Sequence, residues 1–539
     1  MKRILLILII NVLTFTSCDS FLDELPDNRT TIDTKGEISK LLVSAYPSSA
    51  HYCLMCEIAS DNVDDYLGEN SLYSYIFPKQ IAYWEDITTS NNEDPGRVWY
   101  TYYHAIAAAN EALESIKNMG DTEELQAYKG EALLCRAYCH FCLVNVFCRN
   151  FSPKTSKTDL GIPYMMKPES TLEPHYERGT VEDVYNKIEA DLEAGLPLLD
   201  DAIYSVPKYH FNRKAAYAFA SRFYLFHLDY DNVIKYANMC LGNNPSSMMR
   251  DYSTWKNITR DFSLYAQDYV KDTHSCNLML GAGMSVGGKY FGNYSTWKRF
   301  CIQKETTIAE IFNGRMPWGD SYSLEPTGTD YGYPASIVFT YTSGYTVTPK
   351  IPYYFECTDP VANTGYYRAV FPLFEAEEVL MNRAEAYAMK GEYDAAVEDM
   401  LTWQEKHIVG GIKLTRSNIN NFYNNIEYYE PLGKETEISG VTVRLTPSIK
   451  KVLSPDFEYQ KGEQENMIQC ILQIRRLNSV FEGLRWFDIK RWGIEIDRRL
   501  INEQGKIESV VARLPVGDPR RAFQIPEDVI EAGLTANPR

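Results

Sequence analysis

Two segments of this 539-residue chain share one spacing of small and apolar residues, and that spacing fits paired helices stacked on their neighbours. The clearer copy consists of Ala384, Tyr387, Gly391, Tyr393, Ala396, Met400 and Trp403. The other copy, at the same spacing, consists of Ser221, Tyr224, Leu228, Tyr230, Val233, Ala237 and Cys240. This is the pattern of a tetratricopeptide unit, in which a small residue lies where the paired helices touch. Such units bury their apolar faces only by stacking, so the pattern predicts one continuous helical array.

Other stretches extend this array. Residues 98–119 carry a broad apolar stripe at helical spacing, Gly120 follows the stripe, and a second helix is expected to run to about Phe147. Thr180 begins a further helix with a capping sequence. We therefore predict a mostly α fold, a tetratricopeptide-like helical array with a few short strands, in a single domain over residues 37–539. Its helical-repeat units are expected at about residues 98–147, 211–241 and 372–404.

Between the two clear copies, over about residues 241–370, the character of the sequence changes. Gly, Ser, Tyr and Trp dominate, helical periodicity disappears, and short β-prone runs occur. The chain has 40 tyrosines, and many of them lie in this excursion. Long irregular insertions in a helical array are usually functional. We therefore expect the ligand-binding side of the protein here, with aromatic rings as stacking surfaces.

The amino terminus predicts export and lipid attachment. Lys2 and Arg3 precede an apolar run over residues 4–15, which is too short to span a bilayer as a helix. The run is therefore interpreted as a secretory signal that ends at residue 17. Ser17 followed by Cys18 is what a lipoprotein signal peptidase needs, although Phe15 stands where Leu is usual; the alternative is an ordinary signal with an incidental cysteine. Residues 18–36 would then form an acidic tether between the lipid on Cys18 and a domain anchored to a membrane surface.

Net charge excludes one class of partner. Loss of Lys2 and Arg3 with the signal segment takes the net charge of the chain from −18 to −20. An acidic surface repels phosphate backbones, so no nucleic-acid partner is expected.

Several cysteines and acidic residues have side chains that can bind metal ions. Cys18 leaves eleven further cysteines, an odd number for disulfides, and most are expected to be buried thiols. The Cys53–Cys56 pair near His51 lacks a second metal-binding motif, so no zinc site is predicted. The acidic residues 61–65 could hold calcium as an alternative to ligand binding, because hard oxygen ligands cluster there.

No catalytic motif has a convincing context. Residues 283–287 match a GxSxG nucleophile elbow, but this elbow needs a following helix and residues 288–293 are expected to form a loop. Acid pairs such as Asp64 with Asp65 and Glu377 with Glu378 would need to face each other across a sugar. The pair 377–378 lies on an expected helix, where adjacent side chains point apart. We therefore predict that the protein is not an enzyme.

A dense run of aromatic and charged residues lies near the carboxy terminus: Phe481-Glu482-Gly483-Leu484-Arg485-Trp486-Phe487-Asp488-Ile489-Lys490-Arg491-Trp492-Gly493. It has too many apolar groups for one helical stripe, so it should be deeply packed, and its charges should need partners. The run resembles the signature of the SusD/RagB family of Bacteroidetes surface lipoproteins, which bind nutrients, chiefly glycans. Residues 19–23, 136–147 with 161–163, and 525–526 with 537–538 agree with the family in order and position. The resemblance implies an outer-membrane location facing outward and a SusC-like TonB-dependent barrel as partner.

These observations predict a glycan-binding lipoprotein that captures oligosaccharide or polysaccharide and delivers it to such a barrel. One alternative is a binding protein for peptide or another non-sugar nutrient, since tetratricopeptide arrays often grip extended peptides. Another is a scaffold whose aromatic loops only cap the barrel. Sugar hydroxyls both donate and accept, so carboxylates and amides can bind them beside aromatic platforms. The predicted ligand contacts are Asp61, Asn62, Asp64, Tyr83, Trp84, Tyr290, Trp297, Trp318 and Tyr333.

The lipid prediction can be checked directly. Mass spectrometry of the mature amino terminus should find Cys18 as the first residue, carrying acyl chains. An unmodified Cys18, or cleavage elsewhere, would contradict the anchor.

Overall fold

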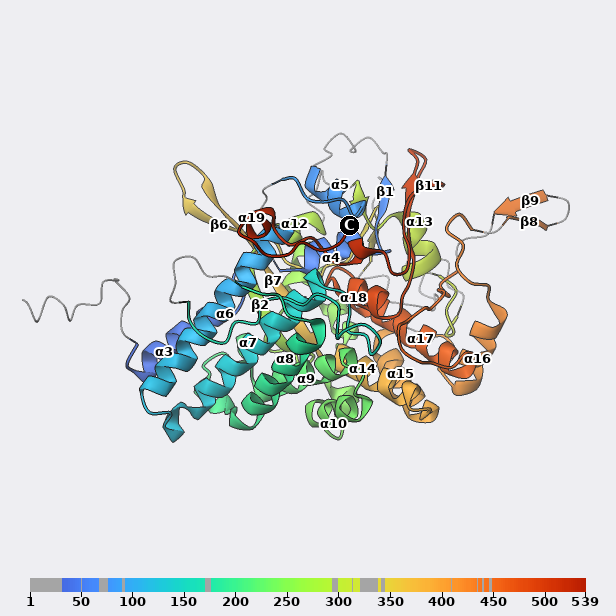
Figure 1. Cartoon of the computed structure of the whole chain (residues 1–539). Coiled ribbons are helices and arrows are strands. Elements are labelled where there is room, and N and C mark those ends of the chain that lie inside the picture. The colour runs from blue at the N-terminus through green and yellow to red at the C-terminus, as the bar shows by residue number, and fades with distance from the viewer. Residues whose placement is uncertain are drawn as a thin grey trace, which may run out of the picture.

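The helical array forms the larger part of the protein. The computed structural model describes residues 32–49, 51–66, 76–89, 93–169, 176–292, 299–312, 314–319, 338–340, 345–408, 410–433, 435–438, 441–444 and 448–539. Its long helices are α6 (Pro95–Asn118), α7 (Gln126–Phe147), α8 (Val181–Gly195), α9 (Arg213–Phe226), α10 (Tyr230–Leu241), α14 (Ala376–Met389), α15 (Tyr393–His407), α16 (Arg416–Asn425) and α17 (Glu463–Asn478). Neighbours along the array pack on one another, and Figure 1 shows them side by side. The predicted mostly α class is confirmed.

The two sequence copies make the same turn between paired helices. Gly391, between α14 and α15, has φ +79°, where glycine carries no Cβ penalty. Leu228 occupies the matching place between α9 and α10 with φ +65°. A left-handed backbone costs a leucine about 1–2 kcal/mol, so packing of the second pair must offset that strain. The less regular copy therefore keeps the backbone geometry of the clearer one.

Helix α7 and helix α8 touch through glycines. A Cβ on Gly130 would lie 2.9 Å from the carbonyl oxygen of Gly195, and one on Gly195 would lie 3.0 Å from the carbonyl oxygen of Gly130.

The predicted start of α8 is confirmed as a capping box. The Thr180 side chain accepts from the backbone N–H of Asp183, and the Asp183 side chain accepts from the backbone N–H of Thr180.

Shorter helices and strands lie mostly on one side of the array (Figure 1). The short helices are α3 (Lys35–Leu42), α4 (Cys53–Ala59), α5 (Ile76–Ala82), α11 (Phe262–Tyr269), α12 (Gly287–Tyr290), α13 (Lys304–Thr306), α18 (Leu484–Arg491) and α19 (Glu527–Glu531). The strands are β1 (Asp64–Tyr66), β2 (Asn277–Met284), β3 (Phe300–Cys301), β4 (Phe339–Thr340), β5 (Thr346–Val347), β6 (Tyr354–Asp359), β7 (Thr364–Glu375), β8 (Glu435–Ile438), β9 (Val441–Arg444), β10 (Ile496–Ile501) and β11 (Ile507–Leu514).

The excursion between the repeat copies is more regular than its composition indicated. It contains α11 and an antiparallel sheet in the order β2-β7-β6, whose outer strand β6 is exposed along its whole length. Periodicity did not reveal β2 because its residues are buried on both faces, so the strand has no alternation of apolar and polar side chains.

A second sheet, in the order β11-β10-β1-β3, joins three distant parts of the chain. Strand β1 pairs in parallel with β10, with Asp65 opposite Leu500, and antiparallel to β3, with Asp65 opposite Phe300. The amino-terminal region, the excursion and the carboxy-terminal region therefore meet at β1.

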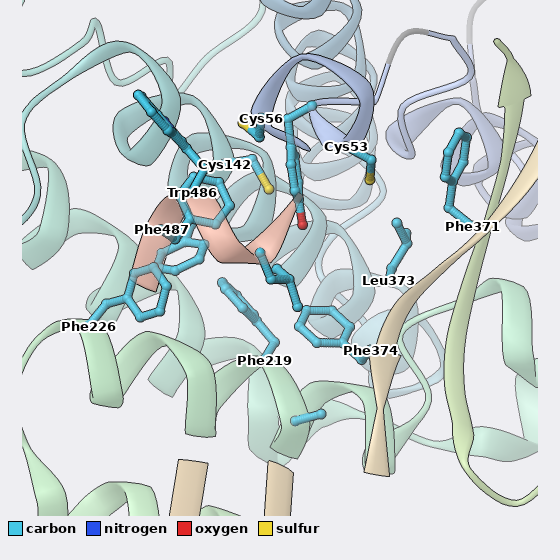
Figure 2. Close-up of a cluster of buried hydrophobic side chains, with 14 of the residues drawn as sticks. Cys53, Cys56, Cys142, Phe219, Phe226, Phe371, Leu373, Phe374, Trp486 and Phe487 are labelled. Atoms are coloured by element: carbon cyan, nitrogen blue, oxygen red, sulfur yellow. The ribbon is translucent and has the colours of Figure 1, made fainter. Parts of the chain in front are cut away.

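The carboxy-terminal aromatic run is packed as predicted. Trp486 and Phe487 of α18 are buried in a cluster with side chains from α4, α9 and β7 (Figure 2). The Phe487 ring lies edge-on to Phe226, with 6.1 Å between ring centroids. Gly483 begins α18 at φ +75°, and a Cβ there would lie 2.8 Å from the Cα of Cys53. Only glycine permits this close approach of α18 to α4.

The charges of this run have partners, as expected for buried ions. Asp488 pairs with Arg475 at 2.9 Å, Arg491 pairs with Glu385 at 2.5 Å, and Lys490 donates to two backbone carbonyls of the α7 end.

The cysteines of the described residues are free, and all except Cys357 are buried, which confirms the prediction for most of them. Within the same residues, no helix is long and apolar enough to cross a bilayer.

Candidate functional site

Asp61 and Asn62 lie in a buried network of ions rather than at the surface. Arg485 donates from Nε and Nη2 to the two carboxylate oxygens of Asp61, at 2.8 and 2.9 Å. Arg476 donates to the side-chain oxygen of Asn62 at 2.8 Å and to the backbone oxygen of Asp61 at 2.9 Å. Burial raises the pKa of Asp61, but the guanidinium groups of Arg476 and Arg485 outweigh it and hold that pKa well below its usual value. Asp61 is therefore a charged, internally paired group.

Asp64 belongs to the same network. Arg499 donates to both oxygens of Asp64, at 2.9 and 2.7 Å, and to Glu310 at 2.5 Å. Lys451 lies 3.5 Å from Asp61 and 3.3 Å from Glu310, so it links the ion pairs of Asp61 with those of Asp64 and Glu310. Burial raises the pKa of Glu310, but Arg499 and Lys451 lower it to about 2. Ligand contact by Asp61, Asn62 or Asp64 stays a prediction, and their burial argues against it.

The calcium alternative lacks a suitable geometry in the same place. The carboxylates of Asp61 and Asp64 are directed at arginines, and the described residues contain no cluster of three or more metal-binding side chains. The Cys53–Cys56 pair is likewise part of the buried core.

Three of the predicted aromatic contacts are core residues. Trp84 is 5% exposed and donates its ring N–H to the carbonyl of Ala59 at 2.9 Å. Tyr290 is 3% exposed, and its hydroxyl donates to the carbonyl of Phe300 at 2.9 Å. Trp318 is buried beside Trp403, with 5.8 Å between their rings. Their ligand role also stays a prediction, and their burial argues against stacking on a sugar.

Three remaining predicted positions lie outside the described residues: Cys18, Trp297 and Tyr333.

Tyr83 is the predicted contact that the structure keeps at the surface. It is half-buried, and its hydroxyl donates to Asp65 at 2.5 Å. Arg299 holds the same carboxylate through two bonds of 2.6 and 2.9 Å, while about a fifth of its side chain stays exposed. Burial and the neighbouring Asp65 raise the pKa of Tyr83, so the hydroxyl stays protonated. We call Tyr83, Asp65 and Arg299 the Tyr83 cluster.

The Tyr83 cluster lies at the end of the sheet that joins the three parts of the chain. The backbone N–H of Tyr66, the last residue of β1, donates to the carbonyl of Arg299 at 2.9 Å, and β3 follows directly. The Tyr83 ring is edge-on to Phe300 at 6.1 Å. The cluster therefore presents an aromatic ring and a guanidinium in fixed positions, which suits a neutral, hydroxyl-rich ligand.

Arg299 was missed by sequence reasoning. It follows Trp297 by two residues, and that proximity to a predicted aromatic contact was the available signal. Its pairing with Asp65, 234 positions earlier, is not visible in the sequence.

The GxSxG motif differs from expectation in one respect: a helical turn, α12, follows β2, where a loop was expected. Ser285 is buried and accepts from the backbone of Gly287 at 3.0 Å, while Glu93 accepts from that of Val286 at 2.6 Å. Burial lowers the pKa of His51 to about 4, and neither ring nitrogen of His51 has a hydrogen-bond partner. Among the described residues, Ser285 and His51 therefore do not form the hydrogen bond that a nucleophilic serine and its histidine base would need.

The acid pair on α14 points in two directions. Glu378 accepts two bonds from Arg222, and Glu377 accepts from the backbone N–H of Arg250. The two carboxylates are buried ion-pair and hydrogen-bond partners, and they do not face each other across a cleft.

Comparison with known proteins agrees with this fold. A family model described as "SusD family" matches residues 244–523, and one described as "Starch-binding associating with outer membrane" matches residues 20–225. The chain belongs to the SusD family, as its carboxy-terminal run led us to expect.

Solved structures support the same fold at low sequence identity. A putative sugar binding protein from Bacteroides vulgatus ATCC 8482 is 18% identical, with 95% of this chain and 99% of that chain covered and a TM-score of 0.59. A SusD-like protein from Bacteroides fragilis NCTC 9343 is 15% identical, with 96% and 99% covered and a TM-score of 0.60. A protein described as a laminarin binding SusD-like protein is 16% identical, with 94% and 100% covered and a TM-score of 0.52. No curated protein matches the chain in sequence.

The buried network makes a prediction about stability. Asp61→Ala removes the carboxylate that pairs with Arg485 and one of the two anions beside Arg476 and Lys451. Breaking a buried pair by removing one partner costs about 3–5 kcal/mol. The free energy of unfolding, measured with urea, should fall by this amount. Glu405→Ala, which removes the exposed partner of Lys413, is the control and should change little. Equal effects of the two substitutions would contradict the structural role of Asp61.

The burial of Glu93 predicts that the stability of the protein depends on pH. Burial raises the pKa of Glu93 to about 7. The pKa of this side chain in the unfolded protein is ~4.3. The free energy of unfolding therefore falls as pH rises from that value through about 7. Glu93→Gln keeps an acceptor for the Val286 N–H and removes this loss. Urea unfolding should show the variant up to roughly 3 kcal/mol more stable than the parent at pH 8 and little changed at pH 4. A constant difference at both pH values would refute the assignment.

Proposed function

We propose that this protein is a non-catalytic, cell-surface glycan-binding protein that captures oligosaccharide or polysaccharide and delivers it to a SusC-like TonB-dependent barrel. Membership of the SusD family supports the class of function. The geometric observation that carries the proposal is the Tyr83 cluster, in which a surface tyrosine and an arginine are fixed by one buried carboxylate.

The chemistry of the Tyr83 cluster fits a neutral sugar. The C–H face of a sugar ring can stack on the Tyr83 ring, and the exposed edge of the Arg299 guanidinium can donate to hydroxyls. Asp65 accepts from both residues, so neither has to be ordered when the ligand binds, which lowers the entropic cost of binding. The acidic chain, with a net charge of −18 before removal of the signal, favours neutral over polyanionic glycans.

The location belongs to the same proposal. We place the protein at the outer membrane, facing outward, with a signal peptide over residues 1–17, a lipid on Cys18 and a tether over residues 18–36. The description of one family model as associating with the outer membrane supports this location. Recovery of the protein alone after gentle detergent extraction would count against the barrel as partner.

Ligand contact by Trp297 and Tyr333 remains part of the proposal. Both belong to the aromatic-rich excursion, and Trp297 lies two residues from Arg299 in the sequence.

Affinity electrophoresis against a panel of neutral polysaccharides, including laminarin, tests the function. At least one polysaccharide should retard the protein, and Tyr83→Ala should weaken that binding about two- to tenfold, since an aromatic contact contributes ~0.5–1.5 kcal/mol. Tyr83→Phe keeps the ring and should bind nearly as the parent does. Tyr366→Ala, at an exposed tyrosine of β7, is the matched control. The absence of retardation on any polysaccharide, together with a measured peptide ligand, would replace the proposal by the peptide alternative.

A further inference from the structure

A concave surface lies between α6 and the carboxy-terminal helix α19. It encloses a cavity of about 840 Å³, within the range of sites for small ligands. Its walls are α6, the stretch 163–169 with Tyr176, and α19 with the residues after it, up to Leu534. We call this cavity the α6–α19 groove; it shares no residue with the Tyr83 cluster.

The wall formed by residues 163–169 is held by buried polar groups. Asn110 of α6 is 1% exposed and donates its side-chain amide to the carbonyls of Met165 and Lys167, at 3.0 and 3.3 Å. Arg136, itself paired with Asp191, donates to the side-chain oxygen of Asn110 at 2.9 Å. This wall is therefore part of the buried polar framework of the array.

The opposite wall is also fixed. Tyr100 of α6 donates its hydroxyl to Asp528 of α19. Asn537 donates to the carbonyls of Phe147 and Phe523, at 2.8 and 2.7 Å, and Arg178 donates to the carbonyl of Thr535 at 2.8 Å. The carboxy-terminal segment is thereby fastened to the helical array, and these contacts hold the second wall of the groove in place.

The groove combines an apolar floor with aromatic sides. Trp99, Ile106 and Leu534 form buried parts of the lining. Tyr100 and Tyr176 are 43% and 38% exposed, although large aromatic side chains are usually more buried. Exposed rings beside a preformed apolar cavity are typical of ligand sites.

The charges at the rim are of both signs. Lys167 supplies a cation, Asp528 and Glu169 supply carboxylates, and all three are exposed. A polyanion would be repelled by the two acids, and an acyl chain could make no hydrogen bond with any of the three groups. A neutral polyol can donate to the carboxylates and accept from the ammonium.

Backbone groups of the groove argue against an extended peptide. Peptides that bind as added strands need free main-chain donors and acceptors along a wall. Here the carbonyls of Pro163, Met165 and Lys167 accept from the side chains of Tyr103 and Asn110. A ligand in the groove would therefore contact the side chains of this wall more than its backbone groups.

We propose that the α6–α19 groove is a second carbohydrate site, which takes a neutral glycan segment between Tyr100 and Tyr176. The assignment rests on the proposed glycan-binding function and adds a place on the protein that the Tyr83 cluster does not include. Two sites on one rigid body raise the apparent affinity for a polysaccharide long enough to reach both.

Two variants test the groove without relying on one residue. The double variant Tyr100→Ala with Tyr176→Ala removes both rings, and Ala107→Trp fills the groove from an exposed position of α6. The probe is the neutral polysaccharide that most retards the parent protein in the panel above, and Tyr366→Ala is the control. Both groove variants should bind it about tenfold more weakly, the control should bind as the parent does, and thermal unfolding should confirm that all are folded.

The outcomes separate the two proposals. If the parent protein binds a glycan and both folded groove variants bind it equally well, the groove assignment is overturned and the proposed function stands. If the parent binds no glycan in the panel, the proposed function falls and the groove assignment falls with it. If the groove variants lose a peptide ligand and keep the glycan, the groove is a peptide site and the assignment is overturned.

Discussion

The ion pairs that join Asp61 and Asp64 to arginines more than 400 positions later are the interaction on which the rest of the structure depends. Charges removed from water are tolerated only when partners and geometry are right. Here α4, α17, α18, β1 and β10 must all be in place before the carboxylates and guanidinium groups can meet. Arg498 adds a related contact, because it donates to the carbonyls of Ile58, Ala59 and Ser60, where α4 ends. These carbonyls lack partners within the helix. The network thus fastens the first part of the chain to the last, and the β1–β10 pairing follows from it.

This constraint also explains which of the two buried acids holds the residues near the surface. Asp65 is the next residue after Asp64 in β1, and successive side chains of a strand point to opposite faces. Asp64 turns toward Arg499 in the interior, and Asp65 turns toward Tyr83 and Arg299 near the surface. One strand therefore connects the buried network with the proposed glycan contact. The geometry of that contact is set by the same residues that hold the fold.

Sequence reasoning found the parts of the structure that are local. The helical ladder, the capping box at Thr180 and the deep packing of the run from Phe481 to Gly493 all follow from spacing and composition within one segment. It placed Asp61 among the ligand contacts because carboxylates can bind sugar hydroxyls, but the arginines that pair with Asp61 lie 415 to 424 positions away in the sequence. Strand β2 was missed for a related reason: burial on both faces removes the alternation by which a strand is recognised. A single sequence contains no local pattern that identifies pairs of residues so far apart.

The separation of buried and exposed groups decides how function can be assigned here. Aromatic content alone pointed to Trp84, Tyr290 and Trp318, yet each is buried and contacts core neighbours. Three accessible rings, Tyr83, Tyr100 and Tyr176, lie where a hydroxyl is held by a carboxylate or beside a cavity. Substituting a buried ring would change binding only by unfolding the protein. Substituting an exposed ring removes contact area without opening a cavity in the core, so a loss of binding at unchanged stability identifies a contact with the ligand.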